Sequence, residues 1–368
     1  MGDPNRGKYQ IWIISAMLAV IMGFTYFSKS NAALTIPERR FEEMLLSNDV
    51  EKIILIKNKD LVEVTLKPDA LEISDRFTLS GVGLWAKKRN IHTVVFSHET
   101  LTGLIKSHFR FSFKKFVNWH NARLASRFNH VIATTAFAAK EFEEIHTDNL
   151  VNIPLGVDLE TFSPKLRNAQ LRRDLLKEQE VLIIHLGRMS PEKNPQNSIL
   201  ALIELRKRGV NARLIYVGMG PMFAKLKQMA AGHPVTFLGY IVDRNKLAEI
   251  MASADVSIAP GPIETFCLAA LESLASGTPV VASSTSAVGE FLLLDSNQPV
   301  GAVAQNNPKS FAEAIQKVLA HSAADRAMPI RCQHQAENYP WSSTLMMMLR
   351  LHGAGREVTV NQKRLRAA

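Results

Sequence analysis

The sequence has little cysteine. Its 368 residues include only two, Cys267 and Cys332, far apart in the chain. Two isolated thiols cannot build a disulfide framework, and they lack the paired spacing of a zinc site. Thiols of this kind persist in reducing compartments. The scarcity of cysteine therefore excludes a disulfide-stapled secreted fold and favours a reducing compartment.

Two catalytic signatures are also missing. No G-x-x-x-x-G-K-[ST] loop is present to cradle the phosphates of ATP. His98-Glu99 continues as Thr100-Leu101-Thr102, so an H-E-x-x-H zinc motif lacks its second histidine. The sequence thus excludes a P-loop ATPase and a zinc protease of this class, and it predicts no metal site.

Acidic residues are outnumbered by basic ones, 34 against 44, which gives a net charge of +10. Phosphorylated substrates and acidic lipids fit this charge, whereas nucleic acid ranks last because no aromatic-basic RNA or DNA signature accompanies it. With 46% hydrophobic and 21% charged residues, the composition is that of a globular protein. The length suffices for two or three domains.

Long apolar runs are rare, but one occupies residues 10–27 and carries no charge from Ile11 onward. Its length is about the minimum for a transmembrane helix, and Trp12 and Tyr26 lie near its ends, as in an aromatic belt. A signal peptide is the competing interpretation, but the apolar region is long and no A-x-A site follows cleanly. We expect residues 1–30 to form a membrane anchor.

Residues 31–80 predict a small α+β segment, with a helix over 37–47 and two strands, Val50 to Lys57 and Leu61 to Leu66, around a turn. Residues 41–53 and Val62-Glu63-Val64, together with the apolar span, resemble the N-terminal region of bacterial membrane-anchored ATP-dependent zinc metalloproteases. The resemblance implies a first membrane helix and a small extracytoplasmic domain.

From Gly81 onward, apolar strands alternate with helices, the pattern of a parallel α/β sheet. A long basic helix is predicted from about residue 101 to 128. Its phenylalanines, Phe109, Phe113 and Phe116, alternate with Lys106, Arg110, Lys114, Lys115, Arg123 and Arg127. This helix could lie on anionic lipid. The simpler interpretation is an aromatic stripe that faces the core, with a solvated basic face.

In open α/β sheets, ligands bind at the carboxyl ends of the strands. Predicted strands in the second half of the chain end at Arg188, Lys193, Gly218, Gly220, Gly239 and Glu264. We expect these residues to converge along one crevice. Cations there can neutralise a diphosphate, and glycines let the backbone approach a ligand closely.

Two carboxylates flank the start of one predicted helix. Glu264 follows the strand Val256 to Ala259, and Glu272 lies about two turns into a helix that we expect to begin with Thr265 as N-cap, roughly 10 Å away. Because a helix N-terminus favours an anion, the pattern suits a sugar-like ligand with phosphate in its middle. The alternative is a loop acid and a solvated helix acid.

Several motifs in order carry a family resemblance over about 82–368. They are Ile153-Pro154-Leu155-Gly156-Val157-Asp158, Gly187-Arg188 with Glu192-Lys193, Gly218-Met219-Gly220-Pro221, Phe237-Leu238-Gly239-Tyr240 and the run Pro260 to Val281. This set resembles the family-4 retaining glycosyltransferases of GT-B fold. The run around Glu264, with His98-Glu99 upstream, looks most like GDP-mannose-dependent mannosyltransferases acting on phosphatidylinositol mannosides or related lipids.

The resemblance implies a role for each matching residue. Arg188 and Lys193 would bind the donor diphosphate and stabilise the leaving group, Glu264 would hold the sugar hydroxyls, and Glu272 the ribose hydroxyls. His98 would contact the transferring hexose from the other domain; a histidine at a strand end is also often only a satisfied polar group. The remaining donor-binding positions are Gly187, Gly218, Gly220, Gly239, Tyr240, Ile241, Thr265, Phe266 and Leu268.

The resemblance also implies a domain plan and some departures from it. We expect a partial, truncated N-terminal Rossmann-like domain over 81–170, a complete donor domain over 171–335, and a C-terminal crossover helix and tail over 336–368. No glycine-rich loop precedes Gly81, so the chain looks like a fusion. Met219 stands where an acid is usual in the family, and Cys267 where a glycine is usual.

The function predicted from sequence is retaining transfer of a hexose, most simply mannose, from a nucleotide-diphosphate sugar such as GDP-mannose to a lipid or glycan acceptor, with no metal or other cofactor. It would take place on the cytoplasmic side of the inner membrane, behind a single N-terminal pass. One alternative is a catalytically impaired nucleotide-sugar-binding or membrane-anchored fragment, and another is a membrane accessory fragment related to the protease. Residue patterns leave the oligomeric state open.

Overall fold

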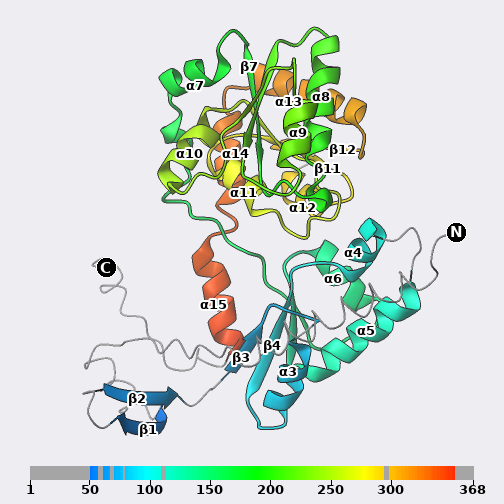
Figure 1. Cartoon of the computed structure of the whole chain (residues 1–368), viewed down its shortest axis with the longest axis vertical. Helices are drawn as coiled ribbons and strands as arrows, with labels where there is room; N and C mark the ends of the chain where they lie inside the picture. The colour runs from blue at the N-terminus through cyan, green and yellow to red at the C-terminus, as the bar shows by residue number, and fades with distance from the viewer. Residues whose placement is uncertain are drawn as a thin grey trace, which may run out of the picture. The chain divides into compact units, whose positions relative to one another are not determined.

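The structure is a computed structural model that describes residues 50–56, 61–66, 70–77, 79–108, 113–293 and 298–352. The chain divides into two units, residues 1–68 and 69–368 (Figure 1). The predicted membrane span at 10–27 and the predicted helix at 37–47 lie outside the described residues. Within the described ranges, no helix combines the length and the apolarity that crossing a bilayer requires.

The first unit contains a β-hairpin. Strand β1 (Val50–Ile56) pairs antiparallel with β2 (Leu61–Leu66), and the register shifts between Val50 and Lys52, as at a β-bulge. The two strands predicted from the alternating sequence are therefore confirmed. The residues that connect them, 57–60, lie outside the described part of the chain.

The second unit opens with a four-stranded parallel sheet in the order β3-β4-β5-β6. Its strands are β3 (Ala70–Ile73), β4 (His92–Ser97), β5 (His130–Ala133) and β6 (Leu150–Asn152). Residues 70–73 belong to this sheet, although their sequence was grouped with the segment 31–80. Helices α3 (Ser80–Lys87), α4 (Leu101–His108), α5 (Lys114–Arg127) and α6 (Ala136–Glu143) connect the strands.

The prediction of one long helix from 101 to 128 is wrong. The structure has two helices, α4 and α5, and the backbone of Phe113 leaves the helical region at φ −103° and ψ 50°. The predicted inward aromatic stripe is also wrong, because Phe113 and Phe116 are each about half exposed. Val117, Asn121 and Leu124 face the core instead, at the i, i+4, i+7 spacing of one helix face.

A six-stranded parallel sheet follows, in the order β12-β11-β10-β7-β8-β9. Its strands are β7 (Val181–Leu186), β8 (Ala212–Val217), β9 (Val235–Phe237), β10 (Val256–Ala259), β11 (Val280–Ser283) and β12 (Gly301–Ala304). Its helices are α7 (Ala169–Leu176), α8 (Gln196–Lys207), α9 (Phe223–Met229), α10 (Arg244–Ser253), α11 (Leu268–Ala275), α12 (Val288–Leu292), α13 (Pro308–Ala324) and α14 (Met328–Ala336), with 3₁₀ turns η1 (Pro164–Leu166) and η2 (Pro191–Lys193).

The strand order of this sheet indicates where a ligand would bind. The chain runs outward from β7 through β8 to β9, then returns to β10 on the other side of β7. Such a reversal leaves an opening at the carboxyl ends of the two central strands, where open α/β sheets bind their ligands. Near-continuous apolar runs such as Leu182 to Ile184 fill both faces with separate buried cores.

The chain passes between the two sheets twice, and the two connecting segments are hydrogen-bonded to each other. The backbone N–H of Val157 donates to the carbonyl of Tyr339 at 2.8 Å, and the hydroxyl of Thr344 donates to the carbonyl of Pro154 at 2.8 Å. Helix α15 (Trp341–Leu351) then returns to the four-stranded sheet, where Met348 packs in one buried cluster with residues of β4 and β5 (Figure 1). A side chain at Gly156 would collide with the backbone of Trp341, so the crossings depend on this glycine.

Candidate active site

Glycines line the switch point of the six-stranded sheet. Gly187, directly after β7, has φ +145°, and Gly218, directly after β8, has φ +126°. The N–H of Gly218 donates to the carbonyl of Gly239 at 2.7 Å, so the ends of β7, β8 and β9 lie close together. A Cβ at Gly218 would overlap the carbonyl oxygen of Gly187, and one at Gly220 the carbonyl of Met189. Gly218 and Gly220 therefore let the backbone segments after β7 and β8 pack closely against each other.

A lysine–glutamate pair bridges the two central strands. Lys193 at the end of η2 and Glu264 in the loop after β10 lie with Nζ 2.7 Å from both carboxylate oxygens. The Glu264 side chain is only 11% exposed. Although desolvation opposes its charge, the neighbouring Glu264 carboxylate raises the pKa of Lys193. The structure thus joins, as an ion pair in a partly buried site, two residues that are 71 positions apart in sequence.

Arg188 lies one residue beyond Gly187, and its side chain is exposed. Behind it, Glu192 accepts a hydrogen bond from the buried hydroxyl of Ser190 and fixes the turn that carries Lys193. The glycine strand end and this turn therefore present two cations beside the crevice. A fixed cation pair of this kind suits a diphosphate.

The loop after β10 departs from the prediction at its helix start. Helix α11 begins at Leu268, and its N-cap is Cys267 in the left-handed conformation, with φ +71° and ψ 78°. Thr265 is therefore not the N-cap. Non-glycine residues rarely adopt positive φ, which explains why a glycine is the easier choice at position 267. Leu268 is partly exposed, whereas the side chain of Phe266 is buried against Phe291, so a donor could meet Phe266 only through its backbone.

Thr265 joins the two sheets instead. Its hydroxyl donates a hydrogen bond to the carbonyl of His98, at the end of β4. Its own carbonyl accepts from the hydroxyls of Thr134 and Thr135, at the end of β5, at 3.3 and 2.8 Å. The carboxyl ends of the four-stranded sheet therefore face the Glu264 loop across hydrogen bonds that only the folded chain could reveal.

His98 follows β4 and lies beside the Glu264 loop, because its carbonyl accepts the hydrogen bond from Thr265. Its ring stacks on Phe96 with centroids 5.1 Å apart and planes 4° from parallel, while its outer side stays exposed. Loss of hydration on the stacked side lowers the pKa of His98 below its usual value. The open edge of the ring can donate or accept a hydrogen bond.

Glu272 belongs to a second cluster of charged side chains, farther along α11. Arg244, at the start of α10, lies 3.6 Å from Glu272 and 3.8 Å from Asp158, and its guanidinium stacks over the Phe162 ring at 5.1 Å. Desolvation raises the pKa of Glu272 despite the nearby cation. Sequence reasoning missed Arg244 entirely and gave Asp158 no role, because only tertiary packing brings them to Glu272.

The loop from Gly239 to Ile241 leads directly into α10 and this charged group. Gly239 has φ +73°, Tyr240 is 76% exposed, and Ile241 packs against the core of the sheet. The predicted binding positions therefore form two neighbouring parts. One is the Lys193–Glu264 pair at the switch point, and the other is the Glu272–Arg244 pair beside the loop after β9.

A cavity of about 680 Å³ adjoins the first part, between the four-stranded sheet and the Glu264 loop. Helices α4, α5 and α6 line it from one side, and Pro262 and Ile263 line it from the other. Its polar lining includes Thr100, Asn118, Lys140, Glu141 and the ion pair of Lys114 with Glu144 at 2.9 Å. The cavity combines charges of both signs, hydroxyls and apolar surface, and no sequence motif pointed to it.

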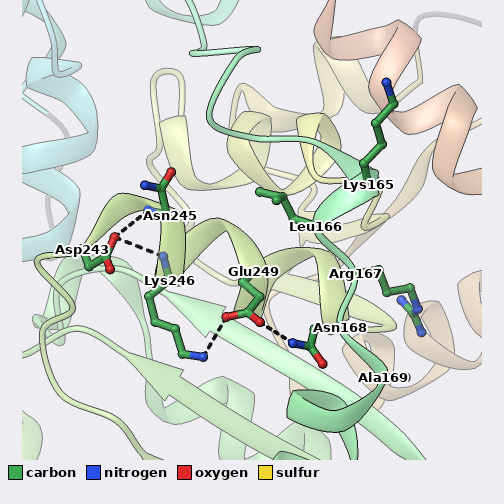
Figure 2. Close-up of a pocket in the computed structure, with 9 residues that line it drawn as sticks. All are labelled: Lys165, Leu166, Arg167, Asn168, Ala169, Asp243, Asn245, Lys246 and Glu249. Atoms are coloured by element: carbon green, nitrogen blue, oxygen red, sulfur yellow. Dashed lines mark hydrogen bonds and ion pairs between the residues drawn. The ribbon is translucent and has the colours of Figure 1, made fainter.

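A second hollow, of about 630 Å³, lies between η1 and α10 (Figure 2). Its polar groups bond to one another: Asp243 caps α10, Lys246 contacts Glu249 at 2.7 Å, and Glu249 accepts from Asn168 at 2.5 Å (Figure 2). None of the predicted site residues lines it. These contacts serve to hold α10 against the turn before α7.

Comparison with solved structures shows the fold of this protein. The chain superposes on the Anabaena protein HepE, solved in complex with UDP and glucose, with a TM-score of 0.64 at 17% identity over 78% of each chain. It also matches the sucrose-phosphate synthase of Thermosynechococcus elongatus with a TM-score of 0.62 at 19% identity, over 89% of this chain and 82% of that one. The fold is that of a GT-B-like glycosyltransferase.

Sequence comparison gives the family. Residues 45–161 match the family described as Glycosyltransferase Family 4, and residues 167–337 match Glycosyl transferases group 1. A GDP-mannose-dependent alpha-(1-6)-phosphatidylinositol dimannoside mannosyltransferase of Mycobacterium tuberculosis is 44% identical over 292 residues, 79% of this chain and 75% of that protein. The chain belongs to the family-4 glycosyltransferases, and it is an enzyme of this type.

The first of these matches also bears on the N-terminal segment. It begins at residue 45, inside the part of the chain that was likened to a zinc metalloprotease. The protease resemblance of residues 1–80 gains no support from these comparisons and stays a prediction.

Proposed function

We propose that the protein transfers mannose from GDP-mannose to a phosphatidylinositol-type glycolipid, with retention of the anomeric configuration. The observation that carries the proposal is the Lys193–Glu264 pair at the switch point of the six-stranded sheet, with Nζ 2.7 Å from both carboxylate oxygens. The name of the 44% identical relative supports the choice of donor and acceptor. Retention is what the family resemblance implies.

The chemical step that we propose needs a stabilised leaving group. The bond from the anomeric carbon to the β-phosphate oxygen breaks, and an acceptor hydroxyl oxygen forms the new bond while its proton passes to the departing diphosphate. Negative charge therefore builds on the diphosphate, and Lys193 and Arg188 lie where fixed cations can stabilise it. This electrostatic role requires no metal ion.

Donor binding would rearrange the pair that the structure contains. Glu264 would accept hydrogen bonds from the hexose hydroxyls, and Lys193 would turn from the carboxylate to the diphosphate. At the other end, Glu272 would accept from the ribose hydroxyls, and Arg244 would hold that carboxylate in place at 3.6 Å. The backbone of 239–241 would border the base.

The 680 Å³ cavity beside the Glu264 loop is our candidate for the acceptor head group. Lys140 in its lining can neutralise a phosphodiester, Lys114 can do so once it turns from Glu144, and Thr100 and Asn118 can bond to the hydroxyls of a polyol. His98 would lie between this cavity and the donor sugar, because its backbone is bonded to Thr265. A lipid acceptor also supports a membrane location, with the predicted span at 10–27 as anchor and the catalytic part on the cytoplasmic side.

Calorimetric titration with GDP-mannose and with UDP-glucose, followed by a transfer assay on phosphatidylinositol mannosides, tests the proposal. We expect Lys193→Ala and Glu264→Gln each to lower kcat/KM about 10²–10³-fold, the range for removing one group that stabilises transition-state charge. Lys207→Ala is the matched control, because Lys207 pairs with Glu204 on the surface of α8. A parallel assay with a chelator tests the absence of a metal.

The outcomes separate the alternatives. Binding of GDP-mannose without transfer would favour the donor-binding protein considered from sequence, and binding of neither donor would overturn both. A product with inverted anomeric configuration by NMR would refute retention alone. Equal losses in Lys193→Ala and Lys207→Ala would remove the special role of the bridging pair.

A further inference from the structure

Three histidines meet at the amino ends of β4 and β5, beside the end of α15 (Figure 1). The ring centroids of His92 and His130 are 5.2 Å apart, and the His352 ring lies 6.1 Å from the His92 ring, nearly perpendicular to it. Nε2 of His352 is also 3.3 Å from a carboxylate oxygen of Glu72 on β3. We call Glu72, His92, His130 and His352 the histidine cluster. It connects three strands of the sheet with the end of the helix.

The register of the strands explains why these side chains meet. Glu72 on β3 and His130 on β5 are both register partners of Val94, so the three side chains point to one face of the sheet. His92, two residues before Val94, points the same way because side chains alternate along a strand. This is the face that α15 covers, since Val94 packs in one buried cluster with residues of that helix. His352, directly after the helix, therefore reaches the other three residues.

The packing favours uncharged imidazoles. Nε2 of His92, Nδ1 of His130 and Nδ1 of His352 are buried and have no hydrogen-bond partner among the described residues. Loss of hydration lowers the pKa of His92 and of His130, and the neighbouring imidazoles lower both pKa values further. In the part of the chain that the structure describes, no group of three or more His, Cys, Asp or Glu residues is placed to hold a metal ion.

A single carboxylate faces the three imidazoles. Glu72 can balance one imidazolium, most directly that of His352 at 3.3 Å. A second proton would place two like charges on rings whose centroids are 5.2 to 6.1 Å apart. The described neighbours offer no further counter-charge: β6 has no charged residue, Arg350 on α15 is an exposed cation, and His98 lies beyond the opposite end of β4. The cluster therefore tolerates one proton and not two.

We propose that the histidine cluster is an acid-sensitive latch that holds the end of α15 on the four-stranded sheet. Above pH 6.5, the ordinary pKa of histidine, the rings are neutral and the latch is complete. As the pH falls, the released rings bind protons more readily than the packed ones, so release of Met348, Leu351 and His352 becomes easier. The first turns of α15 stay attached, because the hydroxyl of Thr344 donates to the carbonyl of Pro154 at 2.8 Å.

Phe96 connects the latch to the proposed active site. It packs in the same buried cluster as Met348, and the ring of His98 stacks on it with centroids 5.1 Å apart. Loss of Met348 from this cluster would loosen the support of His98, whereas the proposed donor residues belong to the six-stranded sheet. We therefore expect acid to lower the rate of transfer before it lowers donor binding. This consequence rests on the proposed function, but the latch can be measured without any transfer.

The test measures hydrogen exchange of residues 345–352 in the full chain from about pH 7.5 to about pH 5.5, relative to the exchange of an unstructured peptide at the same pH. We expect protection to fall roughly tenfold, since two imidazoles gain protons on release and each contributes up to about tenfold per pH unit. Residues 196–207 in α8 are the internal reference, because they belong to the six-stranded sheet. Equal losses in both segments would indicate global unfolding and overturn the proposal.

Variants assign the response to the cluster. His92→Gln/His130→Gln should keep the protection of 345–352 nearly constant over this range, because neither side chain titrates. His92→Leu/His130→Leu tests the same point without buried amides, in case glutamine weakens the helix end. Glu72→Gln removes the counter-charge and should move the loss of protection to higher pH. His233→Asn, at an exposed position before β9, is the matched control and should leave the response unchanged.

The remaining outcomes are distinct. Constant protection of 345–352 in the unmodified chain would overturn the latch, and so would a pH response that persists in both double variants. Protection at neutral pH that increases with added zinc and disappears with a chelator would make the cluster a metal site, with the same consequence. Because exchange needs no substrate, absence of transfer at every pH would refute the proposed function and leave the latch supported. Release of α15 without any change in transfer would support the latch and refute its connection through Phe96.

Discussion

The two sheets of the second unit are filled differently. The six-stranded sheet has a separate apolar core on each face, whereas the four-stranded sheet has smaller apolar clusters beside a buried polar network. Among the described residues, the buried Lys, Arg, Asp and Glu side chains are Arg76 and Glu141, and both belong to the four-stranded part. Exposed phenylalanines are also confined to that part of the described chain.

The buried polar network of the four-stranded part positions two elements that lie beside the site. Arg76 donates to the carbonyl of Glu99 at 2.7 Å and to Asn121, and Glu141 accepts from Asn121 at 3.3 Å. Glu141 also accepts from the first backbone N–H groups of α4, at 2.9 and 2.6 Å. The network therefore fixes the strand end that carries His98 and the helix that lines the cavity. Under the proposed function, the apolar sheet would hold the donor residues, and the polar network would shape the acceptor side.

The largest effect on this contrast should come from Arg76→Leu. Desolvation already lowers the pKa of Arg76, and its removal would take the donor from the side-chain oxygen of Asn121 and the positive charge from beside the buried Glu141. We expect a loss of about 3 kcal/mol in unfolding free energy, measured by urea denaturation. The exposed Arg89→Leu is the control, and equal losses in both would show that the network has no special weight.

A pH titration tests the six-stranded sheet instead of the four-stranded one. Strand β7 of the six-stranded sheet buries His185, whose protonation should lower the stability in acid. Burial lowers the pKa of His185 from 6.5 to about 3, and its ring bonds to Ser198 at 2.9 Å. The unfolded chain binds this proton first, so the contribution is complete above pH 6.5 and is lost as the pH falls toward 3. Unfolding free energy should fall by about 2 kcal/mol from pH 6.5 to 5.

His185→Asn should flatten this dependence, because its amide does not titrate in that range, whereas the exposed His334→Asn should leave it unchanged. Urea denaturation at several pH values provides the measurement. An unchanged slope in His185→Asn would assign the acid sensitivity to other groups.

Glu290 tests the contact between the sheets. Its carboxylate, on α12, accepts from the backbone N–H groups of Ala136 and Phe137 at 3.0 and 2.6 Å, at the start of α6. Removing the charge in Glu290→Gln should cost about 1.5 kcal/mol, so exchange of these two amides should rise about tenfold. Glu313→Gln, whose carboxylate bonds to Arg208 on the surface, is the control. No change at residues 136 and 137 would mean that Thr265 alone holds the sheets together here.

The smallest effect should come from Cys267. Its φ of +71° suits glycine, so Cys267→Gly should be about 1 kcal/mol more stable than Cys267→Ala, which keeps the strain and also loses the thiol. Thermal unfolding of the pair measures the difference. If the alanine variant is equally stable, the left-handed backbone there carries no strain.

Strands and helices with a clear hydrophobic pattern could be predicted from the sequence, whereas short elements of atypical composition could not. Apolar runs such as Leu182 to Ile184 made the strands of the six-stranded sheet visible, because strands buried on both faces are apolar throughout. Short elements escaped prediction: α3 contains Gly81 and Gly83, which hide its helical pattern, and β12 has small residues that resemble a loop. The break between α4 and α5 was also missed, since basic and aromatic residues continue through it.

The sequence by itself determined the class of this protein. Local patterns in the sequence reveal where most strands lie along the chain, the glycines after β7 and β8, and the residues Arg188, Lys193, Glu264 and Glu272. Only the tertiary structure decided which side chains meet. Lys193 contacts Glu264, Arg244 contacts Glu272, and the hydroxyl of Thr265 reaches His98, 167 residues away. Such contacts depend on the strand order and on packing between sheets, which no local spacing encodes.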